Sequence, residues 1–166
     1  MREFLTFPNP VNEKAARVVA GVVLATSVVI LVTGAHWLLI PLAYGFWARV
    51  LTGPTLSPLG WAAQNVIAPA LGPKKPVPGP PKRFAQGMGA IFSTTALVLA
   101  LVAGADTAAD VVLALLVVAA GLESIFGYCV GCKVFGLLMR SGLVPETVCA
   151  ECADISLRLG SAHSSR

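Results

Sequence analysis

The chain has 166 residues, of which 56% are hydrophobic and only 12% charged, and its mean hydropathy is +0.79. Soluble domains carry about 25% charged residues, so the composition argues against a water-soluble globule, and the length indicates one domain over residues 1–166. The net charge of +4 is modest, and no basic groove interleaved with aromatic residues is present, which excludes nucleic acid as a partner. We therefore expect an all-α integral membrane protein whose main partner is the lipid bilayer.

The first apolar stretch is too long for one transmembrane helix. Residues 18–48 contain no charged side chain if His36 is counted as neutral. A single helix of this length would extend about 46 Å, well beyond the roughly 30 Å hydrocarbon core of a bilayer. Thr33, Gly34 and Pro41 interrupt the stretch. We therefore predict two transmembrane helices, at residues 18–33 and 36–51, with Asn12 as the N-cap of the first.

The middle of the chain changes character without gaining charge. Residues 50–73 are uncharged but rich in proline and glycine. Each proline frees a backbone carbonyl that lipid cannot satisfy, so a regular transmembrane helix is not expected here. We predict an interfacial or re-entrant helix at residues 56–72. A basic, proline-rich loop at residues 73–83 follows and is expected at the membrane surface.

The second half predicts two more transmembrane helices, at residues 84–104 and 111–130. The fourth helix is interrupted only by Glu123 and is expected to run on through Cys129 and Cys132. A turn at Ser141 and Gly142 then separates it from a new helix, because Pro145 suits a first helical position. This gives a cysteine-bearing helical hairpin at residues 127–159, which completes the fold with a C-terminal cytoplasmic helix.

The basic residues test this four-helix topology. With four transmembrane helices, all 12 lysines and arginines fall on one side of the membrane. The other side receives only His36, Asp106 and Asp110. The positive-inside rule makes the basic side cytoplasmic, which places both chain ends and all four cysteines there.

The four cysteines form two C-x-x-C pairs, Cys129 with Cys132 and Cys149 with Cys152. Structural disulfides are disfavoured at a cytoplasmic face, which leaves metal binding or thiol chemistry. The spacing C-x2-C-x16-C-x2-C matches four-cysteine zinc sites. In that interpretation, zinc is structural and fixes the C-terminal helix under the bundle.

Thiol redox or sulfur transfer is the competing interpretation. Cys149 is expected about one turn into the helix opened by Pro145, where the positive helix end favours a thiolate. Cys129 and Cys132 have Lys133 beside them, and a nearby cation also favours a thiolate. Regular helical i,i+3 spacing leaves Cβ atoms about 5–6 Å apart, against about 3.8 Å in a disulfide, so a local distortion is required. Gly127 and Gly131 can provide it.

Two polar side chains inside the predicted helices are further candidates. A carboxylate within a transmembrane helix is a functional-site hypothesis, which applies to Glu123. On one continuous helix, Glu123 and Cys132 are rotated by about 180° from each other and do not share a face. Gln86 is expected to make a hydrogen bond between helices.

Three motifs together resemble a bacterial, largely actinobacterial, family of small four-span membrane proteins without an assigned activity. They are F-G-Y-C-V-G-C ending at Cys132, P-E-x-x-C-x-x-C ending at Cys152, and R-F-A-Q-x-x-G ending at Gly89. The resemblance covers about residues 9–159. It implies a plasma-membrane location and adds Arg83 and Gln86 as motif residues without a known role. Members of the family tend to occur near thioredoxin-like and rhodanese-like proteins, which implies partners of those kinds.

Two functional hypotheses follow. In the first, the paired cysteines at the cytoplasmic face exchange electrons or sulfur with a soluble thioredoxin- or rhodanese-like partner, and Cys149 is the more nucleophilic of its pair. In the second, the protein is a non-enzymatic subunit of a larger membrane complex. There the four cysteines bind zinc and fix a docking surface.

Overall fold

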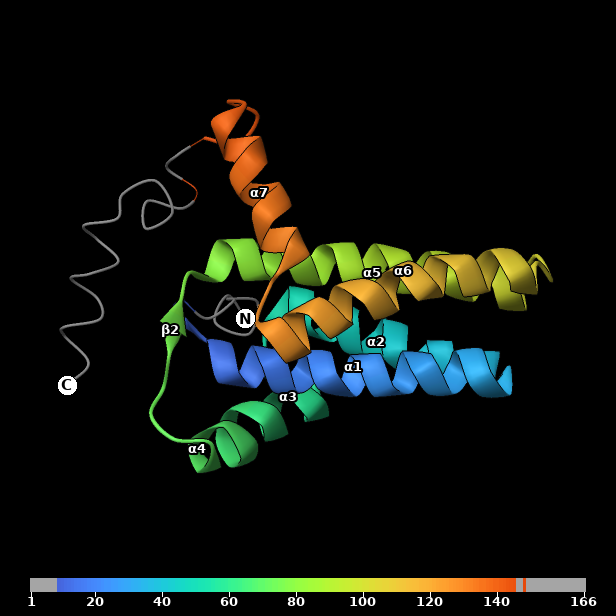
Figure 1. Ribbon diagram of the computed structural model, residues 1–166, viewed down its shortest axis with the longest axis horizontal. Helices are drawn as coiled ribbons and strands as arrows, with labels where there is room; N and C mark the ends of the chain where they lie inside the picture. Colours follow the sequence, from blue (N-terminus) through green and yellow to red (C-terminus); the bar gives the residue numbers. More distant parts are fainter. Residues whose placement is uncertain (1–8, 146–147, 149–166) are drawn as a thin grey trace.

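Figure 1 shows the computed structural model, which describes residues 9–145 and residue 148. The described chain is mostly helical, with one short antiparallel pair of strands. Three of its helices, α1, α5 and α6, are long and apolar enough to cross a membrane. The elements are β1 (Val11–Asn12), α1 (Glu13–Thr33), the 3₁₀ turn η2 (His36–Leu38), α2 (Leu39–Thr52), α3 (Pro58–Ala62), the π-helical turn η3 (Ala63–Ile67), α4 (Ala68–Ala70), β2 (Pro76–Val77), α5 (Gly79–Leu101), α6 (Asp106–Phe126) and α7 (Val130–Arg140).

Four helices form the body of the molecule and run alternately in opposite directions. α1 packs mainly on α6, α2 packs on α5, and α5 also packs on α6 (Figure 1). α7 leaves this bundle at a steep angle and packs on the first half of α5. Apolar side chains fill the bundle, and the largest of the fully buried ones are Ile30, Leu39 and Leu113.

The first helix begins at the predicted cap, five residues before the predicted span 18–33, and ends where the sequence predicts. The Asn12 side chain accepts a hydrogen bond from the Lys14 backbone N–H at 3.1 Å, and Glu13 lies in the first turn, where the helix dipole favours a carboxylate. Gly34 ends the helix with a φ of 68°, a conformation that suits glycine. The predicted N-cap and the predicted break after Thr33 are both confirmed.

The second helix is shorter than predicted. The chain continues from the turn at Gly34 through η2, and α2 has only 14 residues. Such a helix is about 21 Å long, less than the roughly 30 Å hydrocarbon core. The described residues thus contain three candidate transmembrane helices, and α2 is a shorter apolar helix between the first two.

The proline-rich middle of the chain forms one bent helical segment, α3 to α4, that packs against α1. The Ser57 hydroxyl accepts a hydrogen bond from the Gly60 backbone N–H at 3.1 Å, and Pro58 occupies the first turn, so the segment starts with a regular cap. Its bounds, residues 58–70, lie within the predicted 56–72.

The basic loop is shorter than predicted because α5 begins at Gly79 and not at residue 84. Its first turn contains Pro80 and Pro81, and proline suits the start of a helix, where its missing N–H costs nothing. Before it, β2 pairs with β1, with Val77 opposite Val11. This pairing fixes the loop to the start of α1.

The two ends of the bundle carry opposite charge. At the acidic end, His36 lies between two carboxylates of α6, with Nε2 3.0 Å from Asp110 and Nδ1 3.4 Å from Asp106. The lysines and arginines of the described residues lie at the other end, which we call the basic end, or on α7, which leaves it. They are Lys14, Arg17, Arg49, Lys74, Lys75, Lys82, Arg83, Lys133 and Arg140.

Gly89 tests the close packing of α2 on α5. A Cβ atom at Gly89 would overlap the Phe46 ring of α2, whereas one at Gly87 in the same helix would meet nothing within 4 Å. We expect Gly89→Ala to destabilise the protein by about 1–3 kcal/mol through overpacking. Gly87→Ala should be neutral or stabilising, by up to about 1 kcal/mol, from helix propensity. Thermal unfolding of the two variants in detergent compares them directly, and equal melting temperatures would contradict the packing.

Candidate site at the cysteine pair

The last helix of the bundle ends immediately before the cysteine pair. Gly127 follows Phe126 with a φ of 69° and donates its backbone N–H to the Glu123 carbonyl at 3.0 Å. The next N–H, of Tyr128, returns to the Leu122 carbonyl at 3.0 Å. These bonds close the helix in the usual glycine C-cap. The prediction of one helix running through the cysteines is therefore wrong, because Gly127 ends α6 and a new helix begins at Val130.

Cys129 is the N-cap of α7. Its backbone is extended, with φ −84° and ψ 103°, and its sulfur accepts a hydrogen bond from the Cys132 backbone N–H at 3.3 Å. Its Sγ atom lies 2.6 Å from that of Cys132. A helical residue at position 129 would keep the sulfurs apart. The expected local distortion is confirmed, and it lies at Cys129 itself.

Gly131, between the two cysteines, is the point at which α7 touches α5. A Cβ atom there would lie 2.6 Å from both Cα and Cβ of Ala85. One turn further, the rings of Phe84 and Phe135 pack 5.6 Å apart. The sequence suggested that Gly131 loosens the backbone between the cysteines. In the structure it instead permits a close contact between two helices.

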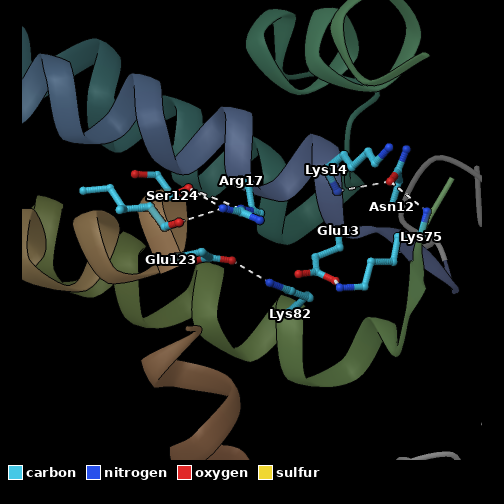
Figure 2. A network of polar contacts seen from close by, with 9 residues as sticks. Asn12, Glu13, Lys14, Arg17, Lys75, Lys82, Glu123 and Ser124 are labelled. Carbon is cyan, nitrogen blue, oxygen red and sulfur yellow. Dashed lines mark hydrogen bonds and ion pairs between the residues drawn. The ribbon is translucent and has the colours of Figure 1, made fainter. Parts of the chain in front are cut away.

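A buried ion pair lies at the same junction. Lys82 of α5 contacts Glu123 of α6 with 2.6 Å between Nζ and Oε1, and their side chains are only 9% and 16% exposed (Figure 2). Sequence reasoning selected Glu123 but separated it from Cys132, because it assumed one continuous helix. Because α6 ends at Gly127, the rotation of about 180° expected between Glu123 and Cys132 on one continuous helix does not apply. The charge of Glu123 acts on both thiols and raises the pKa of each.

Arg17 of α1 fixes the end of α6 from the other side. Its guanidinium donates to the Ser124 carbonyl at 3.1 and 3.2 Å and to the Ile125 carbonyl at 2.7 Å (Figure 2). These carbonyls have no partner within the helix, and a cation is favourable at this end. Glu13, one turn earlier, pairs with Lys75 at 2.8 Å.

The other motif residues of α5 hold α2. Arg83 donates through Nε to the Val50 carbonyl at 3.0 Å, near the end of α2. Gln86 accepts from Arg49 Nε at 2.9 Å, which confirms the predicted hydrogen bond between helices. Arg49 is only 6% exposed; it lies 4.8 Å from the Phe46 ring centroid and donates to the Ser57 hydroxyl at 3.4 Å. Arg83 and Gln86 therefore position a helix and do not reach the thiols.

The two thiols differ in acidity. The pKa of Cys129 is lowered, first because its sulfur accepts a hydrogen bond from the Cys132 thiol, while burial opposes this effect. The pKa of Cys132 is raised, first because it donates that bond and then because it is buried. Since the thiolate is the nucleophile, the directions of these pKa shifts favour Cys129 as the attacking thiol, although it is the more buried of the two.

The second cysteine pair, Cys149 and Cys152, lies outside the described residues, so the predicted four-cysteine site and the predicted reactivity of Cys149 stay predictions. Among the described residues, no three histidine, cysteine or acidic side chains are placed to hold a metal ion.

The fold and the site define a mostly helical protein with several candidate transmembrane helices and a thiol pair at the basic end of its bundle. The family model described as "Domain of unknown function (DUF4395)" matches residues 11–140, and the chain belongs to this family. No curated protein and no solved structure matches the chain. The matched region includes Cys129 and Cys132 and ends before Cys149.

Gly131 gives a test of how the site is held. We expect Gly131→Ala to push α7 away from α5, to lower stability by about 1–3 kcal/mol and to lower the rate of disulfide formation between the two cysteines. Gly136→Ala is the matched control, because its Cβ would meet nothing within 4 Å. Thermal unfolding and the rate of oxidation of the pair measure both effects. Equal behaviour of the two variants would contradict the Gly131 contact.

Proposed function

We propose that this protein is a multi-pass membrane protein whose cysteines carry out thiol redox exchange or sulfur transfer at the cytoplasmic face of the bacterial plasma membrane. Its partner in this proposal is a soluble thioredoxin- or rhodanese-like protein. The chain crosses the membrane four times, with α2 as the short second crossing. Both chain ends are then cytoplasmic.

The proximity of the two sulfur atoms carries this proposal. Cys129 and Cys132 are free thiols whose Sγ atoms are 2.6 Å apart, and Cys129 lies at the N-cap of α7. A helix N-terminus stabilises a thiolate, and a second thiol within reach can resolve a mixed disulfide or take up a transferred sulfur. One thiol thus attacks and the other completes the exchange.

The charge distribution supports the orientation. The basic end carries the lysines and arginines of the described residues, and the other end carries Asp106 and Asp110. Positive residues are retained on the cytoplasmic side during membrane insertion. The thiol pair lies at the basic end.

The two thiols should differ in their reactivity toward an alkylating reagent. In full-length protein with Cys149→Ser and Cys152→Ser, we expect Cys129 to be alkylated much faster than Cys132. Its rate should rise with pH to a midpoint below the roughly 8.5 of an ordinary thiol, because its thiolate is stabilised. Cys132→Ala should move the midpoint upward, since the strongest stabilising hydrogen bond is removed. Mass spectrometry of the alkylated peptides measures these rates.

Metal analysis of the unmodified protein is the control. Stoichiometric zinc, with all four thiols protected until a chelator is added, would overturn the redox proposal. A metal-free protein in which Cys129 and Cys132 cycle between dithiol and disulfide would support it.

Labelling in intact bacterial cells tests the orientation. A maleimide that does not cross membranes should label Cys129 only after the membrane is opened. In a variant whose four cysteines are replaced by serine, Thr107→Cys should be labelled from outside, because Thr107 is exposed at the acidic end. Labelling of Cys129 in intact cells, with Thr107→Cys protected, would reverse the proposed topology.

A further inference from the structure

Lys82 and Glu123 form an ion pair that the function proposed above leaves unexplained. The Lys82 side chain is only 9% exposed, and its partner comes from another helix. Removing two charges from water costs several kcal/mol per ion, and apolar replacements of such pairs are often as stable. The pair is thus poorly explained as a simple stabilising contact. Its place in the fold suggests a different role.

The backbone places this ion pair at the helix junction that carries the thiols. Lys82 is one helical turn before Ala85, on the same face of α5, and Ala85 touches Gly131 between the two cysteines. The Glu123 carbonyl accepts the Gly127 N–H that ends α6, two residues before Cys129. Both charges therefore flank the junction between α6 and α7. Consistently, Lys82 lowers the pKa of each thiol and Glu123 raises it.

The other charged groups around the junction are engaged elsewhere. From α1, Glu13 pairs with Lys75, and Arg17 binds the last carbonyls of α6. On α5, Arg83 turns to the end of α2. Lys133 follows Cys132 directly, but its Nζ lies 5.5 Å from the centre of the Tyr128 ring. The cation that acts on the thiols is thus Lys82, which the sequence separates from them by more than forty residues.

We propose that Lys82 stabilises the attacking Cys129 thiolate and that Glu123 accepts the Cys132 proton when Cys132 attacks in turn. This inference rests on the function proposed above and assigns two positioning and proton-handling groups to it. A buried site favours such an arrangement, because Lys82 has at least one anion beside it at every stage and the net charge stays low.

The Cys129 thiolate attacks one sulfur of a partner disulfide, forms a mixed disulfide and releases the first partner sulfur as a thiolate. Cys132 then passes its proton to Glu123, and its sulfur attacks the Cys129 sulfur of the mixed disulfide. This breaks the bond to the partner and releases the second partner sulfur as a thiolate. The partner gains two electrons and, after protonation by Glu123 and by water, becomes a dithiol, while Cys129 and Cys132 become a disulfide. Glu123 returns to its carboxylate form.

A nitrophenyl disulfide reagent separates the two steps, because each step releases one coloured thiolate. The experiment uses the reduced full-length chain with Cys149→Ser and Cys152→Ser. We expect Lys82→Met to slow the first release about tenfold at neutral pH, which corresponds to a thiol pKa shift of about one unit. Glu123→Gln should leave the first release as fast or faster, yet slow the second about tenfold, so that the mixed disulfide accumulates in mass spectra.

Matched variants control for folding and for charge alone. Lys133→Met removes a neighbouring cation that does not act on the thiols, so both releases should stay within about twofold of the parent protein. Glu123→Asp and Lys82→Arg keep the charges and should recover much of the two rates. The double variant Lys82→Met with Glu123→Gln leaves no unpaired buried charge, and both of its steps should be slow.

A second release from Glu123→Gln at the parent rate would overturn the role of Glu123. If Lys133→Met slowed the first release as much as Lys82→Met does, the role of Lys82 would be overturned. If the parent protein instead binds two reagent adducts and forms no internal disulfide, the proposed function fails. The effect of Lys82 on the first release is still read independently in that case.

Discussion

The contact between Gly131 and Ala85 is the constraint on which the arrangement of the cysteine site depends. α7 has little other support, since it packs mainly on the first half of α5 and leaves the bundle at a steep angle. Without a side chain at position 131, the two backbones approach closely enough to fix the first turn of α7. That turn contains Cys132 and is capped by Cys129. The sulfur geometry is therefore set by a backbone contact and not by the thiols themselves.

The first half of α5 serves as the common support of the basic end. Successive side chains of this helix turn to different neighbours: Lys82 to α6, Arg83 and Gln86 to α2, and Phe84 to α7. The motif R-F-A-Q-x-x-G thus has a physical explanation, because each of its distinctive residues holds a different contact and Gly89 admits the Phe46 ring. A substitution in this half of α5 therefore affects contacts with α2, α6 and α7.

Sequence patterns predicted those parts of the structure that depend on local chemistry. The cap at Asn12, the break after Thr33, the turn at Ser141 and Gly142, and the helix-to-helix bond of Gln86 are all present. The break at Gly127 was missed because the apolar run continues past it, although a glycine after a helical stretch is a common C-cap signal. Lys82, Arg17 and Arg49 were missed as site or support residues for a different reason. Each of them contacts residues far away in the sequence, and Lys82 and Arg49 are also buried. Neither a long-range contact nor burial can be predicted from the neighbouring residues in the sequence.

The bond between Arg17 and the end of α6 has a consequence for the order in which the protein is made. Its two ends are separated by 107 and 108 residues, and the helices they join form the most extensive packing in the bundle. At a synthesis rate of about 5–20 residues per second, the end of α6 is translated roughly 5–20 seconds after Arg17. During that interval the ribosome has yet to add the two cysteines. The thiols thus enter a bundle whose first helix is already in place to receive the segment that precedes them.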